Sequence, residues 1–192
     1  MAKRILLALF AIGLLTTLST LAGLGVFTDT QSVGSNTFTT GTVDISTAPA
    51  SALVTYSNMA PGDSTTQSLA VTNAGTLALR YAIAGSATDP DGKGLKDQLV
   101  LTVKTIDVTT PGTPCDDFDG TQLYTGDLDG TTGALVGSNA QGAQAGDRPL
   151  SASSSETLCF RADLPLSTGN AFQNATTTAT FTFDAEQTVN NP

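Results

Sequence analysis

The sequence predicts an all-β protein folded as an antiparallel β-sandwich. Short segments in which apolar and polar residues alternate recur along the chain, and a period of two is that of a strand with one buried face. Turn sequences rich in Pro, Gly, Asn and Asp separate these segments. The composition agrees, because Thr, Gly, Ala and Asp are abundant and no segment after residue 25 shows a helical period.

The N-terminus has the features of a secretory signal peptide. Lys3 and Arg4 precede an apolar run at residues 5–15, and small and hydroxyl-bearing residues follow as far as residue 25. A retained membrane anchor is the alternative, because residues 5–27 are just long enough to span a bilayer. The hydroxyl-bearing residues interrupt the apolar stretch and favour cleavage. We expect a signal helix that is removed on export.

Five later segments carry the alternating pattern: residues 68–72, 77–83, 99–104, 158–164 and 180–184. One face of each segment is apolar, so each strand would cover half of a core. A turn sequence at residues 60–63 precedes the first of these segments, and turn sequences at residues 73–75 and 89–92 separate the first three. Strands at this spacing, joined by such turns, favour an antiparallel sandwich.

Residues 109–154 depart from this rhythm. They are rich in Thr, Gly, Asp, Pro and Ala, and we expect a long, loop-rich surface insertion with room for a short hairpin. Cys115 lies near its start and Cys159 just beyond its end. In an exported protein such a pair most simply forms one disulfide, which would hold the base of the insertion. A metal site is the alternative, but two thiolates in a chain without His make a poor one.

Four short motifs follow one another along the chain. They are an aromatic-x-Asp at residues 27–29, a Gly-Thr-hydrophobic-Asp-hydrophobic run at 41–45, an Asn-rich turn and hairpin within 58–79, and Phe-x-Phe-x-Ala-x-Gln at 181–187. Their order resembles that of the TasA/camelysin family of secreted proteins. The likeness covers about residues 20–85 and the C-terminus and is weak between them, where the cysteine pair is a departure.

The resemblance implies a jelly-roll sandwich and a signal peptide of the kind that a SipW-type signal peptidase removes. Cleavage would fall between Val26 and Phe27. Residues 1–26 would then be the signal peptide, and residues 27–192 would form a single domain.

The resemblance also implies a function. In TasA fibres the N-terminal segment of one subunit pairs with a sheet of the next, so we expect residues 27–36 to be a donor strand that includes Phe27, Asp29 and Val33. The protein would be a structural subunit of extracellular matrix, biofilm or surface fibres, and its partner would be a second copy, bound head-to-tail. A flexible N-terminus is the alternative for this segment. A monomeric adhesin that binds through residues 109–154 is the alternative for the whole protein.

The resemblance also raises the question of peptidase activity, because camelysin carries a metallopeptidase label. A zinc peptidase needs imidazole or thiolate ligands and a carboxylate base, but the sequence has no His, and Glu156 and Glu186 lie in separate strand-like segments. A nucleophilic Ser or Thr would lack a His base. We therefore expect no enzymatic activity, no small-molecule substrate and no cofactor. The formal net charge of −9 disfavours nucleic-acid binding.

An Asp-x-Asp-Gly sequence occurs three times and is a weak candidate for Ca²⁺ binding. Alternate aspartates on a tight turn resemble the first ligands of an EF-hand loop, but the third acidic ligand and the closing Glu are missing in each case. Asp and Gly also favour turns without any ion, and this is the preferred interpretation. The candidate ligands are Asp89, Asp91, Asp117, Asp119, Asp127 and Asp129. The chain has one Asn-x-Thr triplet, at residues 174–176. Such triplets are common by chance in a Thr-rich chain, so the sequence alone does not assign a function to this one.

Overall fold

The structure is a computed structural model that describes residues 31, 35, 37–51, 53, 57–106 and 115–191. It divides into two units, residues 1–39 and 40–192, and all the described strands belong to the second unit. The expected signal peptide, the cleavage site at Val26 and Phe27, and the donor residues Phe27, Asp29 and Val33 lie outside the described residues. In the part of the chain that the structure describes, no helix is long and apolar enough to cross a membrane.

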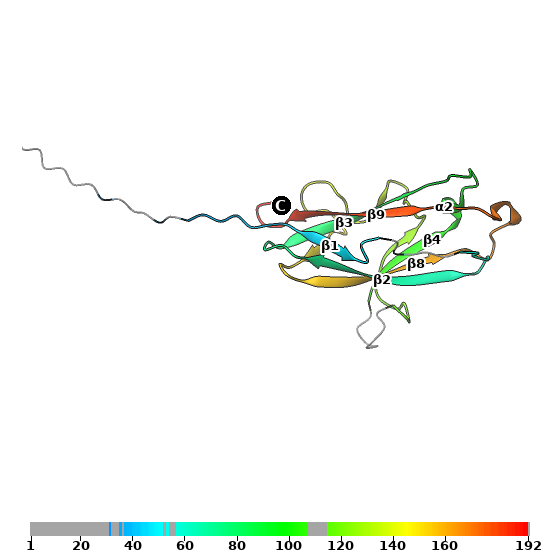
Figure 1. Cartoon of the computed structure of the whole chain (residues 1–192), viewed down its shortest axis with the longest axis horizontal. Coiled ribbons are helices and arrows are strands. Elements are labelled where there is room, and N and C mark those ends of the chain that lie inside the picture. The colour runs from blue at the N-terminus through cyan, green and yellow to red at the C-terminus, as the bar shows by residue number, and fades with distance from the viewer. Residues whose placement is uncertain are drawn as a thin grey trace, which may run out of the picture. The chain divides into compact units, whose positions relative to one another are not determined.

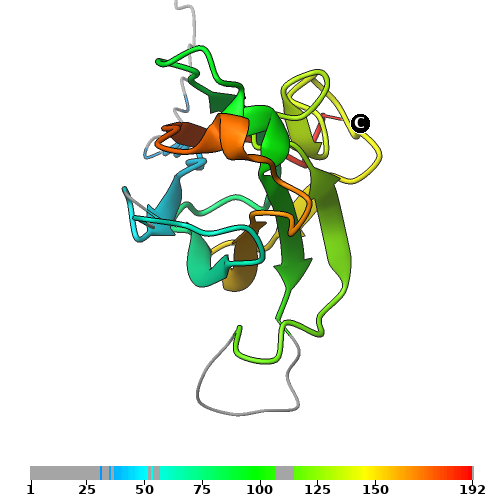
Figure 2. The same cartoon turned by 90° about the vertical axis from the view of Figure 1, so that its right-hand side faces the viewer.

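The described chain of the second unit forms two antiparallel sheets (Figure 1). The first, sheet A, has the order β1 (Ile45–Ala48), β2 (Ser64–Asn73), β8 (Ser155–Asp163), β4 (Val100–Thr105) and β5 (Gln122–Gly126). The second, sheet B, is built on β3 (Leu79–Ala87) and contains β9 (Ala179–Gln187), β6 (Ala134–Val136) and β7 (Arg148–Leu150). Figure 2 shows the same arrangement from one end of the strands, with two short helices, α2 (Leu95–Gln98) and η1 (Asn170–Phe172), in the connections. The prediction of an all-β antiparallel sandwich is confirmed, and the jelly-roll topology stays a prediction.

The core lies between the sheets and is built from the apolar faces that the alternating pattern predicts. Leu158 and Phe160 of β8 are fully buried, as are Tyr81 and Ile83 of β3, which lie in the opposite sheet. Removing such side chains from water is the largest favourable contribution to folding. Further buried core residues come from β2, β3, β4, β6 and β7: Leu69, Val71, Leu79, Leu101, Val103, Leu135, Val136 and Leu150.

Two of the sequence motifs meet at one end of the sandwich. Asn73 is fully buried, and its side-chain amide donates to the carbonyls of Leu77 and Ser151 at 2.8 and 3.0 Å. Its side-chain oxygen accepts from the Gly75 N–H at 2.9 Å, so this Asn replaces the main-chain partners that a strand end lacks. A Cβ on Gly75 would lie 2.4 Å from the carbonyl oxygen of Thr42, so only glycine lets the chain before β1 pack here.

The segment expected to be a loop-rich insertion also contains short strands. Residues 109–154 supply three strands, β5, β6 and β7, which extend both sheets. These strands are three to five residues long, so they are too short to display a periodic pattern. Cys115 and Cys159 are joined in a disulfide, with their Cα atoms 5.5 Å apart, on the outer side of β8. The bridge ties the segment that leads into β5 to the middle of sheet A.

Candidate functional site

The most prominent surface feature is an unpaired strand edge. β9 pairs with β3 along all nine of its residues, and β6 and β7 therefore share the opposite edge of β3. Among the described residues, no strand pairs with the second edge of β9. The other outermost strands, β1, β5, β6 and β7, have only three to five residues each. An unpaired edge presents a row of N–H and C=O groups that can bind another chain, so β9 is the longest such template here.

The hydrogen bonds at both ends of the ladder show which groups face this edge. The Thr88 N–H donates to the carbonyl of Thr178 at 3.0 Å, and the Thr188 N–H donates to the carbonyl of Ala78 at 3.1 Å. Hydrogen-bonded and non-hydrogen-bonded pairs alternate along an antiparallel ladder. The even-numbered residues of β9 therefore direct their main-chain groups toward β3. The odd-numbered residues direct theirs to the open edge: Ala179, Phe181, Phe183, Ala185 and Gln187.

The inward side chains of β9 are only half-buried. The Phe181 ring lies 5.3 Å from that of Phe160, and the Phe183 ring lies 6.0 Å from that of Tyr81, measured between centroids. Both β9 rings pack on the core yet stay partly open to solvent, whereas their partners Phe160 and Tyr81 are buried. An edge strand always leaves some of its inner face uncovered. Here that face consists of large aromatic groups, which an added strand would cover.

A second, shorter open edge lies on sheet A. β8 pairs with β2 from Ser64 to Thr72, but on the other side β1 reaches only from Ala70 to Asn73. The first half of β2 thus has no ladder partner on that side within the described residues. Leu53 and Met59, from the connection between β1 and β2, pack against the core and are half-buried. The edge of β9 is the longer of the two and is the stronger candidate.

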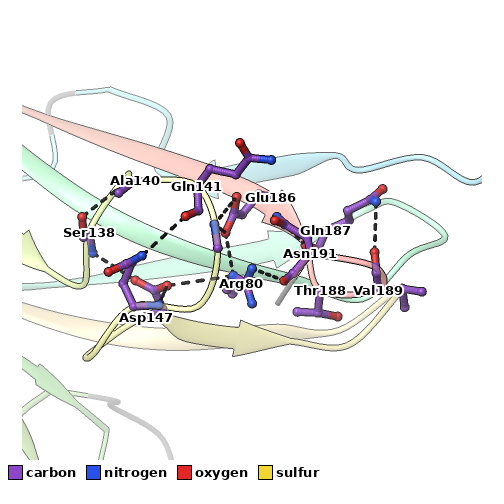
Figure 3. A network of polar contacts seen from close by, with 12 residues as sticks. Arg80, Ser138, Ala140, Gln141, Asp147, Glu186, Gln187, Thr188, Val189 and Asn191 are labelled. Atoms are coloured by element: carbon purple, nitrogen blue, oxygen red, sulfur yellow. Dashed lines mark hydrogen bonds and ion pairs between the residues drawn. The ribbon is translucent and has the colours of Figure 1, made fainter.

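A polar network fixes the C-terminal end of β9 (Figure 3). Arg80 of β3 and Glu186 of β9 are direct cross-strand partners, and Arg80 Nε donates to Glu186 Oε1 at 2.6 Å. Arg80 also donates to the main-chain carbonyl of Asn191 and lies 4.0 Å from Asp147. The Arg80 side chain holds the pKa of the Glu186 carboxyl below its ordinary value, with further help from Asn191 and the Gly142 N–H. This end of the strand is therefore anchored.

The same network folds residues 137–147 over the outer face of sheet B. Asp147 accepts from the N–H groups of Ser138 and Gln144 at 3.0 and 2.8 Å, and the Gly142 N–H donates to Glu186. A shallow pocket of about 300 Å³ remains between this loop and β9. This cluster was not predicted from the sequence. The available signal was one basic and one acidic residue, Arg80 and Glu186, each at a polar position of an alternating strand.

Three of the candidate Ca²⁺ ligands bind other groups of the protein. The Asp89 carboxylate accepts from the Gly94 N–H at 3.0 Å, and the Asp129 carboxylate accepts from the Lys96 ammonium at 2.9 Å. The Asp91 carboxylate accepts from the N–H groups of Lys93 and Thr176 at 3.1 and 2.9 Å. Asp117 and Asp119 lie between the disulfide and β5, and Asp127 directly follows β5. Within the described ranges, no group of three or more His, Cys, Asp or Glu side chains is placed to hold a metal ion. Calcium binding stays a prediction.

Within the described residues, the fold is an all-β sandwich whose longest outermost strand, β9, has one edge without a partner strand. The family model of the camelysin metallo-endopeptidases matches residues 2–191, so the chain belongs to this family. No curated protein matches the chain.

The family description corrects one prediction. The expectation that the protein has no enzymatic activity is contradicted, because the family is described as one of metallo-endopeptidases. The lack of a His-containing zinc motif and of a nucleophile–base pair in the sequence is a narrow basis for excluding a reaction.

The described residues nevertheless do not fit the metal that the family description implies. The chain has no His, and both cysteines are in the disulfide. Glu156 accepts from the Tyr81 hydroxyl at 2.8 Å and pairs with Arg148, while Glu186 pairs with Arg80. Within the described residues, neither glutamate belongs to a group of three or more His, Cys, Asp or Glu side chains that could hold a metal ion.

Proposed function

We propose that the protein is an extracellular structural subunit that assembles head-to-tail by strand addition. The N-terminal segment of one copy, residues 27–36, pairs with the open edge of β9 in the next copy. The observation that carries this proposal is the unpaired nine-residue edge of β9 with its half-buried aromatic face. In this mode of binding, main-chain hydrogen bonds supply affinity and side-chain contacts supply specificity.

The lengths of the two partners support the pairing. The donor segment, residues 27–36, is long enough to form a full ladder with the nine residues of β9. Both strands would rise by about 3.3 Å per residue. Phe27 is its largest apolar side chain, and Phe181 and Phe183 of the acceptor offer the aromatic surface on which such a side chain packs. A contact between two different surfaces that does not close on itself produces an open filament.

Charge affects how fast the copies meet. The full chain carries a formal net charge of −9, so two copies repel one another over the Debye length. Strand addition itself uses uncharged main-chain groups and an apolar face. Assembly should therefore be faster at high ionic strength, which light scattering at several salt concentrations would measure.

The main test uses negative-stain electron microscopy on a chain that begins at Phe27 and on one that lacks residues 27–35. Only the longer chain should form filaments. Filaments from the truncated chain would contradict the donor role, and single particles from both would favour the binding-module alternative.

A proline substitution tests the acceptor edge separately. Ala185→Pro removes a main-chain N–H that faces the open edge and leaves the β3 ladder intact, so the chain should fold but not assemble. Ala185→Ser keeps that N–H and is the matched control, which should still form filaments. Filaments from both variants would show that the partner strand binds elsewhere.

The family description supports a second function, metal-dependent endopeptidase activity. The measurement is cleavage of an unstructured protein substrate by the purified chain with added zinc, compared with the same reaction in excess chelator. Chelator-sensitive cleavage that persists in the chain lacking residues 27–35 would establish peptidase activity independently of assembly.

A further inference from the structure

The loop between η1 and β9 contains the one Asn-x-Ser/Thr triplet of the sequence, Asn174-Ala175-Thr176. Hydrogen bonds on both sides hold its main chain. The Thr176 N–H donates to Asp91 at 2.9 Å, and the Lys93 ammonium donates to the carbonyl of Gln173 at 2.7 Å. The Ala175 N–H donates to the carbonyl of Phe172 at 3.1 Å and completes a turn. The triplet therefore sits on a fixed backbone.

The two side chains that matter in the triplet are both exposed. Asn174 has a φ of 60°, which places it at a turn from which its carboxamide projects. Neither the Asn174 carboxamide nor the Thr176 hydroxyl makes a hydrogen bond to any described residue. The structural contribution of Thr176 comes from its main-chain N–H alone.

The backbone conformation explains the Asn of this triplet but not its Thr. Asn tolerates the left-handed conformation better than most residues, so the backbone alone could require it at position 174. That explanation assigns no role to the hydroxyl group two residues later. An exposed Asn-x-Thr on a surface loop of an exported protein is the context that an N-glycan acceptor requires.

We propose that Asn174 is an acceptor site for an N-linked glycan. The donor is an oligosaccharide joined to a polyprenyl diphosphate. The Asn174 Nδ2 forms a bond to C1 of the first sugar, the bond between C1 and the diphosphate oxygen breaks, and the amide nitrogen loses one proton. The polyprenyl diphosphate leaves, and no group is oxidised or reduced. The site rests on the export that the proposed function includes, but not on strand addition.

Four forms of the full chain test the site: the natural sequence, Thr176→Ser, Thr176→Ala and Asn174→Gln. Each is incubated with a purified oligosaccharyltransferase that recognises Asn-x-Ser/Thr and with its lipid-linked sugar donor. Intact mass should increase by one glycan for the natural chain and for Thr176→Ser. It should not change for Thr176→Ala or Asn174→Gln. Peptide mapping should place the glycan on residue 174.

Two controls make a negative result informative. A peptide of residues 170–180 shows that the transferase is active, and an unmodified folded chain beside a modified peptide would overturn the proposal. The melting temperature of Thr176→Ala should equal that of the natural chain, because Asp91 binds a main-chain group at this position. A glycan that persists in Thr176→Ala would also overturn it. Neither outcome bears on filament formation.

Discussion

β8 and β9 have the same length and a similar pattern, but they have different neighbours. Both have nine residues in which apolar and polar side chains alternate. β8 lies between β2 and β4, and its Leu158 and Phe160 are fully buried. Among the described strands β9 has only β3 beside it, and its Phe181 and Phe183 are half-buried. The pattern of a strand therefore specifies which face is apolar but not how completely that face is covered.

The difference shows where stability and assembly can be separated. A strand that is paired on both sides contributes its full burial to the monomer. An edge strand retains main-chain groups and apolar surface that a second copy can use. Changes in β8 should therefore act on folding, and changes at the outer edge of β9 should act on assembly.

Truncating one phenylalanine in each strand should give the largest contrast. Phe160→Ala removes a fully buried ring and should lower the free energy of unfolding by about 3–5 kcal/mol. Phe183→Ala removes a half-buried ring and should cost roughly half as much. Urea denaturation measures both, with the exposed Thr182→Ala as the control. Equal losses for the two rings would mean that the inner face of β9 is as well covered as that of β8.

The disulfide on the outer side of β8 should have the next largest effect. It closes a loop with a sequence separation of 44, so replacing both cysteines with serine should cost roughly 2–4 kcal/mol. Thermal unfolding of the double variant, beside the natural chain with and without reductant, measures this. Filament formation should survive in the double variant wherever the monomer stays folded, because the bridge does not touch β9. Loss of filaments from a folded double variant would contradict the division between the two strands.

Two neighbouring prolines in β9 sharpen the comparison within a single strand. Asp184→Pro removes a main-chain N–H that faces β3 and should destabilise the monomer by about 1–3 kcal/mol. Ala185→Pro removes one that faces the open edge and should cost clearly less. Urea denaturation of monomeric protein distinguishes the two variants. If Ala185→Pro destabilised the monomer more than Asp184→Pro, the assignment of the even-numbered residues to the β3 side of β9 would be wrong.

The smallest expected effect is the pH dependence of the anchor at the end of β9. Hydrogen bonds from Arg80 and Asn191 lower the pKa of Glu186 below its ordinary value of 4.5. Because its pKa is lower in the folded chain than in the unfolded chain, the ionised Glu186 carboxylate stabilises the fold at pH values above 4.5. This stabilisation is lost as the pH falls through the folded-state pKa. An NMR titration of the Glu186 carboxyl carbon should give a midpoint below 4.5, which should move upward in Arg80→Met. An unchanged midpoint in that variant would remove Arg80 as the cause.

The sequence predicted the long strands well and the short ones poorly. The alternating segments at residues 77–83, 99–104 and 180–184 overlap β3, β4 and β9. β6 and β7 have three residues each, and their place in sheet B depends on the edge of β3 that they meet. The open edge of β9 could not be predicted either, because the residues of a strand do not show whether a second strand lies beside it.

The sequence by itself determined where the main strands run and which of their faces are apolar, because side-chain alternation follows from the local pleat of the backbone. Only the tertiary structure decided which strand is interior and which is an edge. It also decided that Arg80 meets Glu186, 106 residues further along the chain. Strand order and charge pairing depend on contacts between distant segments, and a local pattern contains no information about which distant segment arrives.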